Sequence, residues 1–294
     1  GQEQTVDLVL TAILANGHVL IEGVPGVAKT LLARLTARLI DADFSRIQFT
    51  PDLMPSDVLG TTVFNMKTNG FDFHQGPIFA DIVLVDEINR APAKTQAALF
   101  EVMEERQVSI DGTTHRMGEL YTILATQNPV EQEGTYKLPE AQLDRFLMKI
   151  TMDYPSLEEE VNILERHHTN AALVKLEDVT PVLTKEELLS LRALMSRVFV
   201  DRTLLQYIAL IVQQTRTSKA VYLGASPRAS VAMLQSSKAY ALLQGRDFVT
   251  PEDIKFVAPY VLQHRLILTA EAEMEGYSPV KVTQRLIDKV EVPK

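Results

Sequence analysis

The feature that most constrains this chain is a glycine-containing turn between a predicted strand and a predicted helix. The turn is Gly23-Val24-Pro25-Gly26-Val27-Ala28-Lys29-Thr30, which follows the apolar run 18–21 and precedes a helical repeat of leucines that begins at Leu31. It departs by one residue from the pattern G-x-x-x-x-G-K-[ST], whose amides, lysine and hydroxyl bind nucleotide phosphates and Mg²⁺. The turn therefore predicts a phosphate-binding loop. An ordinary strand–turn–helix corner is the alternative.

The departure is Ala28, which stands where the pattern has its last glycine. Alanine is the smallest intrusion that could replace that glycine. If Gly26 takes the positive φ that the turn requires, Ala28 can adopt the helical φ and ψ of a helix N-terminus without strain. We therefore expect the loop to be functional, with residues Gly23 to Leu31 around the nucleotide. Lys29 is expected on the β- and γ-phosphates and Thr30 on Mg²⁺.

A second predicted nucleotide element lies further along the chain. Four consecutive apolar residues, 82–85, are typical of a strand buried on both faces of a parallel sheet. Asp86 and Glu87 follow it directly, at the end of the strand where open α/β sheets bind ligands. We expect Asp86 to hold Mg²⁺ and Glu87 to orient the water that attacks the γ-phosphate. Without other motifs, an acidic pair after an apolar strand is more often a solvated strand end. The phosphate loop earlier in the chain favours the nucleotide-site interpretation instead.

A third strand pattern, 121–126, leads into Gln127-Asn128-Pro129. The side-chain amide of Asn128 can hydrogen-bond both the γ-phosphate and the attacking water. An Asn-Pro turn is the alternative interpretation.

Two arginines are candidates for stabilising the charge of the transition state. Arg145 precedes a short strand pattern, 147–150, and could project from that edge into a neighbouring subunit's active site. Arg228 lies in the first turn of a helix that Ser226 caps and Pro227 opens, where a cation opposes the helix dipole unless an anion binds nearby. The alternatives are a surface ion pair at Arg145 and a tolerated exposed charge at Arg228.

Together these motifs resemble those of the AAA+ ATPases. Residues 23–30 are similar to Walker A, 82–87 to Walker B, Asn128 to sensor 1, Arg145 to the arginine finger and Arg228 to sensor 2. Three further stretches, 48–57, 76–79 and 101–106, resemble the pattern that the MoxR group shares with the magnesium-chelatase ATPase subunit. Ala28 also occurs in many MoxR-type loops. The resemblance covers nearly the whole chain.

The first half of the chain, 1–155, alternates strand and helix patterns. This alternation predicts an α/β nucleotide-binding core, a parallel sheet with helices on both faces. Two segments interrupt it. Residues 61–76 contain an Asn-Gly pair and residues 107–118 an Asp-Gly pair, each a signal for a β-hairpin. The resemblance implies that these hairpins are the helix-2 insertion and the pre-sensor-1 hairpin, which face the central pore in related rings. The alternative is that the two hairpins only extend the edge of the fold and line no pore.

The remainder, 156–294, is predicted to be an all-α lid domain. Strand patterns are no longer visible there, and helix starts recur. Ser156 with Glu159 and Thr184 with Glu187 match the capping box, in which two side chains and two backbone amides bond reciprocally.

Composition narrows the classes of function. The chain has 294 residues, and 46% of them are hydrophobic, enough to fill a large core. It has no cysteine, which excludes disulfides, a thiolate zinc site and a cysteine nucleophile. A formal net charge of -9 argues against a large nucleic-acid footprint. No apolar run approaches the roughly 20 residues that span a bilayer, and no signal peptide is visible. We therefore expect a cytoplasmic protein, bacterial or archaeal by its resemblance.

The resemblance also implies what such a protein does. It implies Mg²⁺-dependent ATP hydrolysis in a homo-hexameric ring, with Arg145 acting in trans. It further implies a chaperone that matures or assembles partner proteins or inserts their metal cofactors, with a client protein and a von Willebrand factor A domain protein as partners. A chelatase-type motor subunit would share every nucleotide residue named above. A DNA motor would need a basic pore, and a nucleotide-gated scaffold would bind ATP with little turnover.

Overall fold

The computed structural model describes residues 2–128, 135–168 and 176–293. The chain divides into two compact units. The first unit comprises Gly1–Val6, Leu20–Leu138 and Thr151–Leu189, and the second comprises Asp7–Val19, Pro139–Ile150 and Ser190–Lys294.

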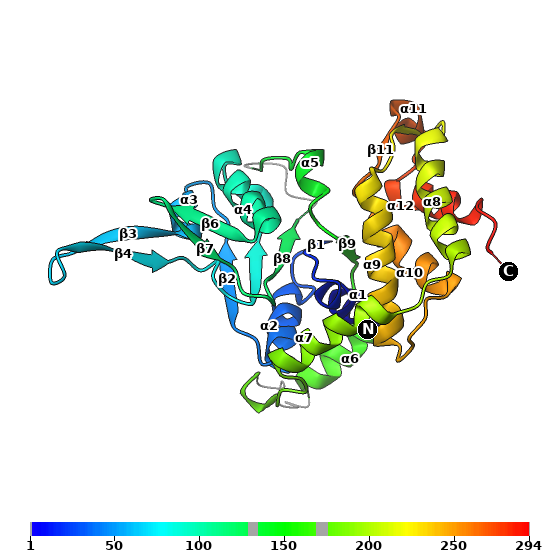
Figure 1. Ribbon diagram of the computed structural model, residues 1–294. Coiled ribbons are helices and arrows are strands. Elements are labelled where there is room, and N and C mark those ends of the chain that lie inside the picture. The colour runs from blue at the N-terminus through cyan, green and yellow to red at the C-terminus, as the bar shows by residue number, and fades with distance from the viewer. Residues whose placement is uncertain (1, 129–134, 169–175, 294) are drawn as a thin grey trace. The chain divides into compact units, whose positions relative to one another are not determined.

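The main sheet has five strands among the described residues, in the order β2-β5-β8-β1-β9 (Figure 1). These strands are β1 (Val19–Gly23), β2 (Phe44–Gln48), β5 (Ile82–Asp86), β8 (Thr122–Gln127) and β9 (Met148–Met152). The β2–β5 and β5–β8 pairs are parallel. All of β5 and all but the last residue of β8 are buried, as the apolar runs predict for central strands. The predicted parallel α/β fold is confirmed.

Helices connect these strands. In the first unit they are α2 (Lys29–Leu39), α3 (Pro55–Leu59), η1 (Ile88–Arg90) and α4 (Ala93–Glu105). Helix α2 follows β1 and contacts β5, burying its small residues Ala33 and Ala37. This close packing brings the start of α2 beside the carboxyl ends of the central strands, where ligands bind in such sheets.

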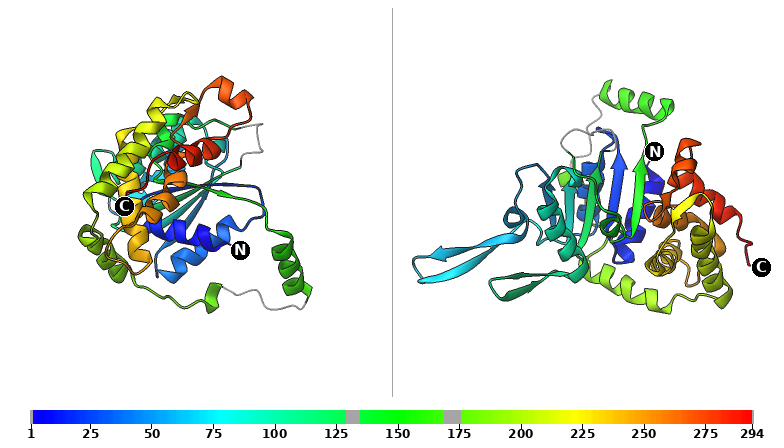
Figure 2. Two further views of the ribbon diagram at one scale, coloured as in Figure 1. Left: turned by 90° about the vertical axis from the view of Figure 1, so that its right-hand side faces the viewer. Right: turned by 90° about the horizontal axis from the view of Figure 1, so that it is seen from above.

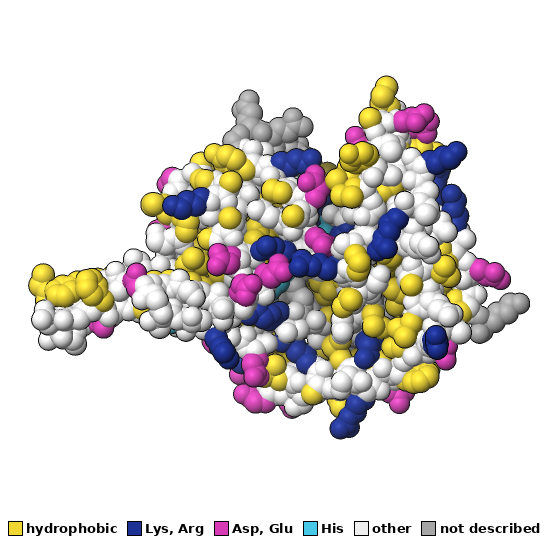
Figure 3. All heavy atoms as spheres, turned by 45° about the horizontal axis from the view of Figure 1, so that its top comes forward, with side chains coloured by type: hydrophobic (Ala, Val, Ile, Leu, Met, Phe, Trp, Pro, Cys, Tyr) yellow, Lys and Arg dark blue, Asp and Glu magenta, His cyan; other side chains and the backbone are white. Residues whose placement is uncertain are grey.

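Two hairpins leave the main sheet at the segments that the Asn-Gly and Asp-Gly pairs predict. They are β3 (Gly60–Asn65) with β4 (Gly70–Gln75), and β6 (Gln107–Ile110) with β7 (Thr113–Arg116). Asp111 and Gly112 both have positive φ, 49° and 79°, the geometry of a two-residue type I′ turn. The β3–β4 hairpin extends away from the sheet, and apolar side chains gather at its outer end (Figures 1 and 3). The exposed apolar residues there are Val63, Phe64, Met66 and Phe71.

The predicted capping boxes are confirmed. The Ser156 amide donates to Glu159 Oε2 at 2.7 Å and the Glu159 amide to Ser156 Oγ at 3.3 Å, at the start of α6 (Leu157–His168). Thr184 and Glu187 make the same pair of bonds, 2.8 Å and 3.2 Å, at the start of α7 (Lys185–Leu194). Between these helices lies η2 (Leu176–Asp178).

The second unit is mainly helical. Part of α7 belongs to it. Its other helices are α1 (Glu3–Leu14, from Asp7), α5 (Glu140–Leu143), η3 (Met195–Arg197), α8 (Arg202–Thr217), α9 (Pro227–Leu243), α10 (Pro251–Leu262), α11 (Ala270–Met274) and α12 (Pro279–Asp288). Helices α8, α9, α10 and α12 pack as a bundle, drawn yellow to red in Figure 2. Among the described residues, none of the helices has the length and hydrophobicity needed to cross a membrane.

The expectation that strands end before 156 is wrong in one place. Strands β10 (Val221–Leu223) and β11 (Ile267–Leu268) form a short antiparallel pair within the helical unit. Segments of three and two residues are too short for the alternation of apolar and polar positions that signals a strand.

Candidate active site

The loop 23–30 connects β1 to α2 and has the compact geometry of a phosphate-binding turn. Gly23 lies so close to β9 that a Cβ on it would approach the Met152 carbonyl oxygen to 2.7 Å. Gly26 has φ 87°, a conformation that glycine adopts without cost. Lys29 is the first residue of α2, and its Nζ donates to the Gly23 carbonyl oxygen at 2.6 Å. The lysine therefore folds back over the loop that precedes it.

Ala28 does not take the helical conformation that the sequence analysis expects. Its φ is 62° and its ψ is 26°, in the left-handed region. The loop therefore needs positive φ at both Gly26 and Ala28, which explains why the usual pattern has a second glycine. For a residue with a Cβ this conformation costs roughly 1–2 kcal/mol. Strain of this kind persists only where the surrounding structure holds it, commonly at functional sites.

Asp86 ends β5 and has two partners on neighbouring strands. Its Oδ1 accepts a hydrogen bond from the Thr126 hydroxyl on β8. Its Oδ2 accepts one from Arg46 Nη2 on β2 at 2.7 Å. The Asp86 side chain is mostly buried, at 13% exposed, whereas that of Arg46 is 48% exposed. The candidate metal ligand is therefore a largely buried carboxylate that already faces a cation.

Glu87 lies beside it in a left-handed backbone conformation, with φ 57° and ψ 50°. Its amide donates to Thr126 Oγ1 at 3.0 Å. Its carboxylate Oε2 accepts a hydrogen bond from Gln48 Nε2 at 2.7 Å and pairs with Arg90 Nε at 3.2 Å. The candidate catalytic base is thus held by two side chains, one from β2 and one from η1.

These groups line one cavity with the phosphate loop. Its volume is about 410 Å³, and its lining residues are Pro25, Gly26, Ala28, Lys29, Thr30, Leu31, Asp86, Glu87, Thr126 and Asn128. Asn128 follows β8 and is 7% exposed, while Pro129, the second residue of the alternative Asn-Pro turn, is outside the described residues. The structure therefore brings together the loop, both carboxylates and Asn128, because β1, β5 and β8 are close in the sheet. Gly23 and Val24, which were also predicted to lie around the nucleotide, are not among the residues that line this cavity.

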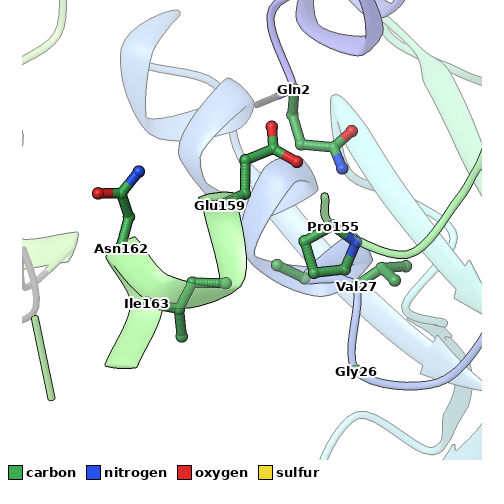
Figure 4. A pocket seen from close by; sticks show the side chains of 8 residues that line it. Gln2, Gly26, Val27, Pro155, Glu159, Asn162 and Ile163 are labelled. Carbon is green, nitrogen blue, oxygen red and sulfur yellow. The ribbon is translucent and has the colours of Figure 1, made fainter. Parts of the chain in front are cut away.

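A second cavity, of about 270 Å³, adjoins the other side of the loop and shares Gly26 and Ala28 with the first. Its remaining lining residues are Gln2, Val27, Pro155, Glu159, Asn162 and Ile163. In Figure 4 the loop at Gly26 and Val27 is on one side, and helix α6 with Asn162 and Ile163 is on the other. The walls combine apolar surface with side-chain amides.

Arg145 and Arg228 both belong to the second unit. Ser226 precedes α9 and Pro227 is its first residue, as predicted, which puts Arg228 in the first turn. The Ser226 hydroxyl does not cap the helix, however, because it donates to Asp144 Oδ2 at 3.3 Å. That bond joins the segment of Arg145 to the segment of Arg228. The approach of either arginine to a nucleotide stays a prediction.

The groups that hold the two carboxylates were not predicted from the sequence. Arg46 and Gln48 come from β2, Thr126 from β8 and Arg90 from η1. A signal was available for two of them, since residues two apart on a strand point to the same face. Arg46 and Gln48 are such a pair, and Arg46 Nη2 also donates to Gln48 Oε1 at 2.9 Å.

Comparison with known proteins gives consistent matches. The profile of the ATPase family associated with various cellular activities (AAA) matches residues 18–148, and an AAA lid domain profile matches residues 213–288. The uncharacterized protein YeaC of Bacillus subtilis is 48% identical over all of this chain and 91% of its own length. Chaperone MoxR1 of Mycobacterium tuberculosis is 45% identical over all of this chain and 79% of its own. A crystal structure from Cytophaga hutchinsonii is 42% identical, covers all of this chain and 91% of its own, and has a TM-score of 0.91.

Proposed function

This chain belongs to the MoxR family of AAA ATPases, and we propose that it hydrolyses ATP at the cavity between the phosphate loop and the carboxyl ends of β5 and β8. The observation that carries this proposal is the convergence of Lys29, Thr30, Asp86, Glu87 and Asn128 on that one cavity. A lysine, a hydroxyl, two carboxylates and an amide are the side chains that nucleotide hydrolysis requires for binding phosphate, metal and water.

The two cavities on either side of the loop suit the two ends of ATP. The larger one, with Lys29 and the amides at the start of α2, suits the phosphates, because a helix N-terminus attracts anions. The smaller one suits the base. Val27 and Ile163 supply apolar surface there, and the amides of Gln2 and Asn162 can hydrogen-bond ring nitrogens. ATP would therefore lie across Gly26 and Ala28.

The residues present also fit Mg²⁺. Thr30 and Asp86 supply the oxygen ligands that this ion prefers, and Asp86 already draws the positive charge of Arg46. When bound, the ion would neutralise charge on the β- and γ-phosphates. Asp86 would then exchange the Arg46 guanidinium for the metal.

Glu87 is the residue that we expect to orient the attacking water. Its Oε2 is occupied by Gln48 and Arg90. Weakening those two contacts would allow the carboxylate to accept a hydrogen bond from the water, while the Asn128 amide would contact the γ-phosphate. Turnover would therefore depend on a small rearrangement at Glu87 as well as on nucleotide binding.

We further propose that the protein works as a homo-hexameric chaperone ring in the cytoplasm. MoxR1 is named a chaperone, which supports the same class of work here. Arg145 would contact the nucleotide of the neighbouring subunit and Arg228 would couple the nucleotide to the helical unit. A von Willebrand factor A domain protein and a client protein would be partners. The apolar end of the β3–β4 hairpin supports a client contact, because exposed apolar groups of this kind mark protein-interaction surfaces.

The test is to measure ATPase rate against protein concentration, with light scattering on the same samples. Glu87→Gln is the test variant, and Glu101→Gln, an exposed glutamate on α4 of the same unit, is its matched control. We expect specific activity to rise as rings assemble, to vanish in Glu87→Gln with ATP binding retained, and to persist in Glu101→Gln.

Other outcomes would change the proposal. Undiminished turnover in Glu87→Gln would refute the site assignment. Activity that is independent of assembly would refute the ring as the active form. Negligible turnover by the unaltered protein, with tight ATP binding and ring formation, would favour a nucleotide-gated scaffold.

A further inference from the structure

The second unit contains a buried arginine to which the sequence motifs assign no role. Arg265 follows α10, and its side chain is only 4% exposed. Burial lowers the pKa of its guanidinium, and the Asp144 carboxylate acts in the opposite direction. Burying such a charge is costly, and a well-packed apolar pair is often as stable or more so. The cost suggests that this arginine does more than fill the core.

Its hydrogen bonds go to the segment around Arg145 and to the end of helix α10, which precedes it. Arg265 Nε donates to Asp144 Oδ1 at 2.6 Å. Its Nη2 donates to the carbonyl oxygens of Asp144, at 3.2 Å, and Phe146, at 2.6 Å. Its Nη1 donates to the Leu147 carbonyl at 3.1 Å and to the Val261 carbonyl. Because a guanidinium is rigid and planar, these bonds fix the backbone on both sides of Arg145.

Asp144 extends the same cluster to α9. Its Oδ1 accepts from Arg265, while its Oδ2 accepts from the hydroxyl of Ser226 at 3.3 Å. Ser226 is two residues before Arg228. The Asp144–Arg265 clamp, defined as these two side chains with Ser226, therefore holds the segments of both candidate arginines, Arg145 and Arg228.

We propose that Arg265 is a positioning residue for ATP hydrolysis: through the clamp it fixes the turn that presents Arg145 and links that turn to the helix that carries Arg228. This inference rests on the proposed role of Arg145 at a nucleotide. Charge stabilisation of a transition state depends on placement, and an error of about 1 Å can cost about a hundredfold in rate. A turn held by four hydrogen bonds from one rigid group limits such errors.

The test variant is Arg265→Lys, which keeps the charge next to Asp144 but cannot reproduce the planar set of donors. Its matched control is Arg246→Lys. Arg246 makes a comparable pair in the same unit, donating from Nη2 to Asp253 Oδ1 at 2.5 Å, but Asp253 lies at the start of α10 and accepts from the Thr250 amide. Both changes weaken a buried carboxylate pair, and only one touches the turn of Arg145.

We expect Arg265→Lys to lower kcat at least about tenfold while the Kd for ATP and ring formation change less than about twofold. Hydrogen exchange should quicken at residues 144–147. Mixing with Glu87→Gln subunits should restore part of the turnover, because those subunits supply an intact Arg145 turn. Arg246→Lys, at the same folded fraction, should retain kcat. Equal losses of kcat in the two variants, or no loss in either, would overturn the proposal.

A second variant covers the case in which Arg265→Lys does not fold. Ser226→Ala removes only the hydroxyl bond to Asp144, and we expect it to lower kcat without weakening ATP binding. In that case an unchanged kcat in Ser226→Ala would overturn the proposal. Arg145→Ala separates the two levels of inference. If that variant keeps full turnover, the role proposed for Arg145 fails, whereas unchanged exchange at 144–147 in Arg265→Lys would refute the clamp itself.

Discussion

Replacing Arg46 by alanine should strengthen Mg²⁺ binding at the nucleotide site. Arg46 Nη2 lies 2.7 Å from Asp86 Oδ2, so a metal ion that binds this carboxylate must displace the guanidinium. The Arg46→Ala variant has no such cation to displace. The Thr126 bond to Asp86 Oδ1 is retained, so the carboxylate keeps one of its two partners.

The size of the effect follows from the exposure of the pair. Arg46 is 48% exposed and Asp86 13% exposed, so solvent screens the attraction on the arginine side. Measured values for exposed pairs are about 0.2–1 kcal/mol, and the buried carboxylate favours the upper part of that range. A contribution of about 1 kcal/mol corresponds to a roughly fivefold change in an equilibrium constant.

The assay is a Mg²⁺ titration of the protein bound to a fluorescent, non-hydrolysable ATP analogue at fixed ionic strength. We expect the apparent Kd for Mg²⁺ to fall about two- to fivefold in Arg46→Ala. Arg116→Ala, which removes an exposed arginine from β7 of the same unit, controls for the change in net charge. A Kd that is unchanged, raised, or lowered equally in both variants would refute the reasoning.

Three further predictions concern stability. Ala28→Gly should raise the free energy of unfolding by up to about 1 kcal/mol, because it relieves the left-handed alanine but adds disorder to the unfolded chain; chemical denaturation measures it. Burial lowers the pKa of His264 well below its ordinary value. Protonation of this histidine in the unfolded chain should therefore lower the free energy of unfolding as pH falls below about 6.5. His264→Gln should flatten that decline, as measured by chemical denaturation at a series of pH values. Ser156→Ala should speed amide exchange in the first turn of α6, because the Glu159 amide loses the Ser156 hydroxyl that accepts its hydrogen bond.

Each of these predictions has an outcome that contradicts it. Ala28→Gly less stable than the unaltered protein would mean that the left-handed strain is negligible. An equally steep acid decline in His264→Gln would assign it to other groups. Amide exchange in α6 that is as slow as before would mean that packing, and not the cap, holds the first turn.

The sequence predicted the fold where patterns are local and long. Strands such as 82–85 are uninterrupted apolar runs, and Asp111-Gly112 is the two-residue turn that its residue pair predicts. The Asn69-Gly70 pair marks the right hairpin, but its turn is residues 66–69 and Gly70 already belongs to β4. The short β10–β11 pair was missed because its partners are far apart in the chain and carry no alternating pattern. Pairing of that kind is decided by the packing of helices around it, which no local window contains.

The candidate site was predicted in its parts but not in its contacts. Asp86 and Glu87 could be located from the strand that precedes them, whereas their partners Arg46 and Gln48 depend on which strand lies next to β5. The conformation of Ala28 was predicted wrongly, because one positive φ was assumed to be enough for the turn. Arg265 carried no motif, since its role arises from a segment more than a hundred residues earlier.

The β3–β4 hairpin has a consequence for how the protein responds to heat and to proteases. Among the described residues its two strands form a sheet of their own, and such ribbons are only marginally stable in water. Phe64 and Phe71 are paired across the ribbon, with ring centroids 5.3 Å apart, and this contact stabilises its outer half. The ribbon can therefore open and reclose while the nucleotide core stays folded. Mild warming should make it a cleavage site before any loss of ATP binding.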